Sequence, residues 1–362
     1  MQPVLRGRLI VLGVLVALDL GFLFVGARDG EAEAIIEPPA GMSRVRIGLV
    51  FDVGGRGDRS FNDAAYLGLL RAKQELGADV EVIEPSEGAD RESAIRIFAA
   101  RGFDLVIGVG FIFSQDLTDL AREYPSVHFA CIDYSPPFDG AGKPLPIPTN
   151  LVGLKFREEE GSFLVGAVAA LESRSKVVGF VGGMDVPLIH KFEAGYREGV
   201  RATCPSCRVV VQYAGSTPVA FKDPARGAAI AQSQLGQGAD VLYHASGSTG
   251  LGVIRVAREN GVWAIGVDSD QYDDGVDPEA PGKSAVLTSM VKRVDVAVLE
   301  AIRSVALRKF EPGVRVFGLR ESGVDYVRDG EHGAAIRPET KARIEELRDR
   351  IVRGEISVSE GP

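Results

Sequence analysis

The sequence contains few of the residues that most often carry enzyme or metal chemistry. Four histidines, three cysteines and one tryptophan occur in 362 residues, and the histidines are dispersed. The zinc-hydrolase motif HExxH and the nucleophile motif GxSxG are both absent, and no group of side chains has metal-ligand spacing. We therefore expect no catalytic residue, no metal site and no cofactor.

An excess of positive charge is also missing. Lys and Arg number 41 and Asp and Glu 50, so the formal net charge is -9. Nucleic-acid surfaces need basic residues to neutralise phosphates, so no nucleic-acid partner is expected. The chain is 45% hydrophobic and 25% charged, which is typical of a globular protein, and it is long enough for two domains.

The N-terminus has the pattern of an export signal or an uncleaved membrane anchor. Arg6 and Arg8 precede a mostly apolar run at 9–27, which Asp19 interrupts. A buried core helix is the alternative, but the run has no polar helical face. Residues 27–43 form a polar tether containing Ala, Pro and Gly. We expect an exported, extracytoplasmic body that folds and binds without the N-terminal 40 residues, and that is tethered to the cytoplasmic membrane if the segment is an uncleaved anchor.

The cysteines suggest structure rather than catalysis. No cysteine lies near the apolar run, which excludes a lipid-modified N-terminal cysteine. Cys131 lies in an apolar run and is expected to be an inert core residue. Cys204 and Cys207 form CPSC between a predicted helix and a strand, which is the wrong side for a thioredoxin-like motif. Zinc would need two further ligands nearby, so a local disulfide is the preferred interpretation.

After residue 43, short apolar runs typical of strands alternate with amphipathic stretches typical of helices. The first series comprises predicted strands at 44–52, 79–85, 103–110, 127–134 and 150–156 and predicted helices at 60–76, 92–102 and 113–125. Ser60 and Asp63 have the spacing of a capping box. Near-continuous apolar strands, each followed by a helix, indicate an α/β fold with a parallel sheet covered on both faces.

A second αβ series follows, and after a loop at 271–285 the chain adds a strand at 286–292 and a helix at 293–307. We expect two lobes joined by more than one crossing, with 286–292 returning to the first lobe. The predicted boundaries are 1–43 for the signal or anchor and tether, 44–156 plus about 284–310 for the N-terminal lobe, 157–283 for the C-terminal lobe, and 311–362 for a C-terminal segment whose lobe is left open.

Candidate binding residues follow from the rule that open parallel sheets bind ligands beyond the carboxyl ends of their strands. The residues at such positions are Asp52, Phe61, Asn62, Phe111, Gly247, Asp268 and Lys292. Each also has a structural interpretation, because an aspartate at a strand end often caps a loop, the phenylalanine could pack on its own helix, and the lysine could be solvated or pair with Asp268. Carboxylates from both lobes with an aromatic side chain suit hydroxyl recognition and stacking.

Five segments in order resemble the basic membrane protein family of ABC-transporter substrate-binding lipoproteins, which includes purine nucleoside receptors. They are LVFDVGGRGDRSFND, EEEGSFLVGAVAA, VGFVGGMDVPLIHKFEAGYREGV, AIGVDSDQ and VLTSMVKRVD. The resemblance implies a type I periplasmic-binding-protein fold, with two Rossmann-like lobes and a hinge crossed three times. It also implies a nucleoside ligand, an ABC permease as partner and a monomeric state.

The resemblance assigns roles to single residues. It implies that Asp52 contacts the base, that Phe61 stacks on the purine with Asn62 beside it, and that Asp268 binds ribose hydroxyls with Lys292 alongside.

The loop that contains Gly247 departs from the family pattern. Relatives have AGGTG where this chain has ASGSTG, so Ser246 and Ser248 differ from the pattern. A second stacking aromatic is expected, and Tyr243 and Phe221 are both candidates.

The sequence therefore predicts an extracytoplasmic solute-binding protein of an ABC importer that binds a purine nucleoside or a related neutral heterocycle. One alternative is a membrane-anchored sensor that uses the same clamp, and genomic neighbours would distinguish it from a transporter. The other alternative is a nucleoside-processing enzyme, which would turn over a bound nucleoside.

Overall fold

The computed structural model describes residues 36–85 and 90–361, so the predicted signal or anchor lies outside the described residues. Pro38–Pro362 form one compact unit that contains two six-stranded sheets. Within the described part of the chain, no helix combines the length and apolar character needed to cross a membrane.

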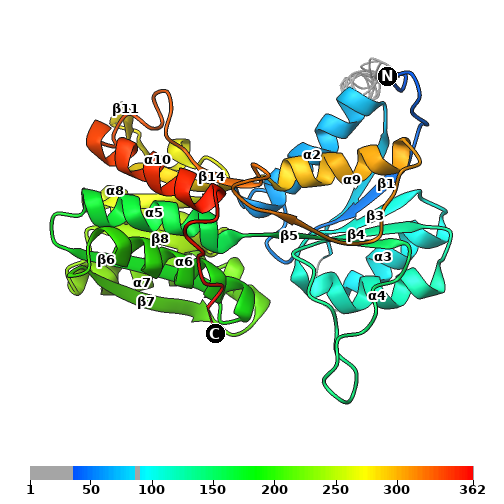
Figure 1. Cartoon of the computed structure of the whole chain (residues 1–362), viewed down its shortest axis with the longest axis horizontal. Helices are drawn as coiled ribbons and strands as arrows, with labels where there is room; N and C mark the ends of the chain where they lie inside the picture. Colours follow the sequence, from blue (N-terminus) through cyan, green and yellow to red (C-terminus); the bar gives the residue numbers. More distant parts are fainter. Residues whose placement is uncertain (1–35, 86–89, 362) are drawn as a thin grey trace, which may run out of the picture. The chain divides into compact units, whose positions relative to one another are not determined.

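The first sheet has the strand order β13-β5-β4-β3-β1-β2, and all its pairings are parallel. Its strands are β1 (Arg46–Val50), β2 (Asp79–Ile83), β3 (Leu105–Gly108), β4 (His128–Ile132), β5 (Leu151–Phe156) and β13 (Gly313–Phe317). Its helices are α2 (Phe61–Leu76), α3 (Arg91–Ala100), η2 (Phe111–Phe113), α4 (Ser114–Glu123) and α9 (Val294–Ala306). Figure 1 shows α2 beside α9 over one face of this sheet, with α3 and α4 on the other. The apolar residues of β1, β3 and β4 are buried because helices cover both faces.

The second sheet has the order β14-β12-β9-β8-β6-β7, and only its edge strand β14 runs antiparallel. Its strands are β6 (Val177–Met184), β7 (Arg208–Gly215), β8 (Val241–Ala245), β9 (Trp263–Asp268), β12 (Val286–Lys292) and β14 (Val324–Tyr326). Its helices are α5 (Glu158–Glu172), α6 (Pro187–Thr203), η3 (Pro218–Phe221), α7 (Pro224–Gly236), α8 (Thr249–Glu259), η4 (Tyr272–Gly275) and α10 (Pro338–Val352), and a small hairpin pairs β10 (Val276–Asp277) with β11 (Ala280–Ser284). We call the first sheet with its helices the first lobe, and the second sheet with its helices the second lobe.

The chain passes between the two lobes three times. It leaves the first sheet after β5 and enters α5, returns from β12 to α9, and leaves again from β13 to β14. The implied α/β fold with a multiply crossed hinge is confirmed.

The expectation that residues 286–292 return to the first lobe is wrong. They form β12, which pairs with β9 on one side and β14 on the other, inside the second sheet. The chain crosses only after Lys292, so α9 packs on α2 in the first lobe as expected. The unassigned C-terminal segment supplies an edge strand to each sheet and α10, which packs on α5.

Helix α2 begins differently from the predicted capping box. The Ser60 hydroxyl is buried and has no hydrogen-bond partner among the described residues. Asp58 instead accepts from the backbone N–H groups of Asn62 at 2.8 Å and Asp63 at 3.1 Å. Asp63 in turn accepts from the backbone N–H of Arg59 at 3.0 Å. Two carboxylates therefore hold the loop that precedes α2.

Cys204 and Cys207 are joined in a disulfide between α6 and β7, and Cys131 is a buried free thiol. The preferred interpretation of CPSC is confirmed. Burial raises the pKa of the Cys131 thiol, so this side chain is inert at neutral pH.

We expect Cys207→Ser to lower the free energy of unfolding by about 2 kcal/mol or less, because the disulfide closes a very short loop. Ligand affinity should not change, since neither cysteine lines the cavity described below. Thiol counting on the denatured, unreduced protein should find one thiol per chain. A count of three, or weaker ligand binding by the variant, would contradict the structural role.

Candidate functional site

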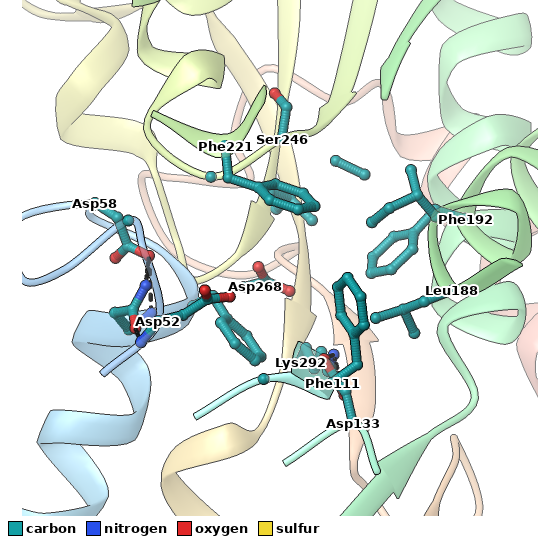
Figure 2. A pocket seen from close by; sticks show the side chains of 18 residues that line it. Asp52, Asp58, Phe111, Asp133, Leu188, Phe192, Phe221, Ser246, Asp268 and Lys292 are labelled. Atoms are coloured by element: carbon teal, nitrogen blue, oxygen red, sulfur yellow. Dashed lines mark hydrogen bonds and ion pairs between the residues drawn. The ribbon is translucent and has the colours of Figure 1, made fainter. Parts of the chain in front are cut away.

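A cavity lies where the carboxyl ends of strands from the two sheets face each other (Figure 2). All the binding residues predicted from the sequence line it, namely Asp52, Phe61, Asn62, Phe111, Gly247, Asp268 and Lys292.

The parallel strands explain why residues far apart in sequence meet here. From the first lobe come Asp52 after β1, Phe61 and Asn62 at the start of α2, and Phe111 at the start of η2. From the second lobe come Gly247 after β8, Asp268 at the end of β9 and Lys292 at the end of β12. Each lies at or just beyond a strand's carboxyl end, which is the edge where open α/β sheets bind ligands.

Several lining residues were not predicted from the sequence. They are Gly54, Asp58, Asp133, Leu188, Ile189, Phe192, Ala245, Ser246 and Val267. Asp133 follows β4 directly, so the rule that selected Asp52 could have found it. Leu188 and Phe192 lie on α6 and reach the cavity from its flank (Figure 2), and no strand-end rule points to them.

Of the two candidates for a second aromatic wall, only Phe221 lines the cavity. It follows β7 in η3 and lies on the side of the cavity opposite Phe111 (Figure 2). Tyr243 is fully buried in the second lobe, where its ring packs 5.1 Å from that of Tyr196 and its hydroxyl lies 3.0 Å from the Ser162 hydroxyl. Tyr243 therefore belongs to the core.

Lys292 is held by carboxylates from both sides of the hinge. Its Nζ donates to both oxygens of Asp133 at 2.7 Å and lies 3.0 Å from Oε1 of Glu158. Burial disfavours the charged ammonium, but these carboxylates outweigh it, so the pKa of Lys292 is raised. Glu158 also accepts from Lys191 at 2.7 Å. We call Asp133, Glu158, Lys191 and Lys292 the hinge charge cluster.

Asp268 faces the cavity with part of its hydrogen-bonding capacity unused. Its Oδ1 is buried without a hydrogen-bond partner among the described residues. Burial raises its pKa to about 7, although the nearby charge of Lys292 acts in the opposite direction. Its backbone has a φ of +64°, a strained value for a residue with a side chain. This carboxyl group is suited to accept hydrogen bonds from a ligand.

Asp52 forms a similar acceptor on the first lobe. Burial raises its pKa to about 7, against a hydrogen bond from the Val53 N–H at 2.5 Å to Oδ1. A side chain at Gly110 would lie 2.8 Å from Oδ2 of Asp52, so the glycine leaves room for this oxygen.

The side-chain amide of Asn62 lines the cavity, but both of its polar atoms bond to other protein groups. Its Oδ1 accepts from the backbone N–H of Asp52 at 3.1 Å, and its Nδ2 donates to Asp58 at 3.0 Å. The amide therefore fixes the backbone that carries the Asp52 carboxyl group.

Removing Lys292 should destabilise the protein strongly. Lys292→Met leaves the buried Asp133 carboxylate without its cation, and breaking a buried ion pair in this way lowers the free energy of unfolding by about 3–5 kcal/mol. Urea unfolding at neutral pH measures the change.

Lys283→Met is the matched control, because Lys283 is exposed on β11. It should change stability by less than about 0.5 kcal/mol. A similarly small effect of Lys292→Met would show that the hinge charge cluster contributes little to folding.

Comparison with known proteins agrees with this geometry. Residues 45–361 match the family described as ABC transporter substrate-binding protein PnrA-like. An uncharacterized lipoprotein of Pyrococcus abyssi is 35% identical over 321 residues, which are 85% of this chain and 75% of that protein. The ABC transporter nucleoside-binding protein BmpA of Lactococcus lactis is 29% identical over 329 residues, which are 87% and 89% of the two chains.

The same similarity is seen in three dimensions. The crystal structure of an ABC transporter system solute-binding protein from Aeropyrum pernix superposes with a TM-score of 0.75 at 30% identity. The match covers 86% of this chain and 92% of that one, so it includes both lobes and the cavity between them.

Proposed function

Because this chain belongs to the PnrA-like family of ABC transporter substrate-binding proteins, we propose that it captures a purine nucleoside between its lobes and delivers it to the permease of an ABC importer. The proposal rests on one observation, which is the set of side chains that line the cavity between the lobes. Aromatic rings and carboxyl groups from both lobes line it, and Oδ1 of Asp268 has no hydrogen-bond partner among the described residues.

The aromatic walls suit a flat heterocycle. Phe61 from the first lobe and Phe221 from the second both line the cavity. Stacking of a base on an aromatic ring contributes about 1–3 kcal/mol, and it tolerates different bases because each has a flat face. The relative from Lactococcus lactis, whose name describes nucleoside binding, supports the same ligand class.

The carboxyl groups suit the polar edges of a nucleoside. We propose that Asp52 accepts from the base and that Asp268 accepts from ribose hydroxyls. A ligand without those donors would leave buried oxygens unpaired, which disfavours its binding. Lys292 acts indirectly in this proposal, since its ammonium group is already bound by Asp133 and Glu158.

The N-terminal pattern of Arg6, Arg8 and the apolar run supports export to the outer side of the cytoplasmic membrane. We propose a monomer that meets its permease there. The sensor and enzyme alternatives are separated from this function by direct assays. Nucleoside uptake by membrane vesicles that contain the permease would support transport, and recovery of unaltered nucleoside after incubation would exclude turnover.

Phe61→Ala and Asp268→Ala should weaken binding in different ways. Loss of Phe61 removes stacking and should weaken adenosine, guanosine, inosine and adenine alike, by about 1–3 kcal/mol. Loss of Asp268 removes hydrogen bonds to a charged group, about 1.5–3 kcal/mol, and should affect the three ribonucleosides but not adenine. Titration calorimetry on the wild type and both variants measures these differences.

Tyr243→Phe serves as the control, because it removes a hydroxyl from the core of the second lobe and leaves the cavity unchanged. If the wild type binds no nucleoside below millimolar concentration, the purine assignment fails. If Asp268→Ala weakens adenine as much as adenosine, this residue does not read the sugar.

Asp52 and Asp268 should make binding depend on pH. Burial holds each pKa at about 7 in the free protein, and ligand donors would favour the charged carboxylates and so lower both pKa values. Binding should therefore release protons, and affinity should fall below about pH 7 by up to tenfold per pH unit for each group. Calorimetry in buffers of different ionisation enthalpy measures the released protons.

The same two carboxyl groups should make the folding stability of the free protein decrease with rising pH, whereas ligand affinity should increase. Their folded-state pKa lies above the ordinary aspartate value of 3.8, so the folded state binds more protons than the unfolded state from about pH 4 to 7. Their contribution to stability therefore decreases as pH rises through that range. Asp268→Asn should reduce both pH dependences, and an affinity that is constant from about pH 5.5 to 8.5 would contradict the assignment.

A further inference from the structure

The two lobes also touch beside the cavity, through residues that do not line it. Arg59 of the first lobe places its Nε 2.5 Å from Oδ1 of Asp274 in η4 of the second lobe. Nearby, the Ser269 hydroxyl of the second lobe donates to the backbone carbonyl of Ser60 at 3.2 Å. We propose that these two contacts form a latch, which holds the lobes together over a bound solute and sets how fast the solute leaves.

The latch is joined to the binding site through the backbone. Ser60 directly precedes Phe61, and Ser269 directly follows Asp268, so each hydrogen-bonding partner is one residue from a side chain that lines the cavity. A ligand that draws Phe61 and Asp268 toward each other also brings the latch residues into contact. The latch and the ligand therefore stabilise the same arrangement of the lobes.

The first-lobe half of the latch is held in place before contact. Arg59 has a φ of +54°, in the left-handed region that residues with side chains seldom adopt. Its backbone N–H donates to Asp63, and Asp58 accepts from the N–H of Ser60. The two carboxylates maintain a strained loop that projects Arg59 toward the other lobe.

The second-lobe half of the latch is the largely buried carboxylate of Asp274, whose charge is stabilised by Arg59. The side chain of Asp274 is only 7% exposed, whereas that of Arg59 is 56% exposed. Burial raises the pKa of Asp274, and Arg59 acts in the opposite direction. Oδ2 of Asp274 accepts from Nε2 of Gln271 at 3.4 Å. When the lobes separate, Asp274 loses its cation and gains water, so the ion pair favours the closed arrangement only.

The latch is tested in the full-length chain with Arg59→Gln, Asp274→Asn and the double variant. Fluorescent labels are attached to cysteines introduced at Ala100 on α3 and Ala229 on α7, which are exposed and lie in different lobes. Single-molecule energy transfer then measures the separation of the lobes without any ligand. Stopped-flow measurements give the dissociation rate of bound inosine.

Each single variant should shift the unliganded protein toward a larger lobe separation and speed inosine dissociation by about threefold to tenfold. The double variant should behave like either single variant, because the two side chains act through one contact. The matched control is Arg255→Gln, which removes an ion pair to Glu259 that lies wholly within α8, and it should change neither quantity.

The outcomes separate the latch from the proposed function. Unchanged lobe separation in both single variants would overturn the latch, whatever the ligand. A changed separation in a protein that binds none of adenosine, guanosine and inosine would support the latch and contradict the purine assignment. Additive effects in the double variant would also overturn the latch, since they would mean that Arg59 and Asp274 act independently.

Discussion

The rest of the structure depends on a buried lysine between two carboxylates. Lys292 ends a central strand of the second sheet, Asp133 follows a strand of the first, and Glu158 begins the helix that the chain enters after its first crossing. A cation in this position joins the end of a first-lobe strand to the first and second crossings of the chain, and without it the Asp133 carboxylate would be buried without its cation. Asp133 and Lys292 also line the cavity, so two of the charges that join the lobes form part of the wall of the site.

Much of the fold followed from the sequence, because buried parallel strands have a clear local pattern. Runs such as those at β1, β3, β8 and β9 are mostly apolar, and each ends at or near a glycine or a polar residue, which locates both the sheet and its binding edge. The partner of β12 could not be predicted this way. An apolar strand fits the middle of either sheet equally well, and its pairing is decided by long-range contacts. The short edge strand β14 has no strong periodicity, so residues 311–362 could not be assigned to a lobe.

The residues of the site, like the strands, could be predicted only where a local sequence pattern marks them. Residues at strand ends were found because the position itself is the signal. Leu188 and Phe192 reach the cavity from within a helix, where an apolar side chain usually means core packing. The network around Asp58 was missed because Ser60 and Asp63 match a capping box in sequence, while the actual acceptor lies two residues before that serine. Local spacing predicts which groups can bond, but the path of the loop decides which of them do.

The interleaved order of the strands has a consequence for how the protein forms. The first sheet is completed by β13 and the second by β12 and β14, all of which come after both αβ series. Neither lobe can therefore finish its sheet during synthesis until nearly the whole chain has left the ribosome. The two lobes must then mature together, and an early stop before residue 313 would leave each sheet without its last edge strand.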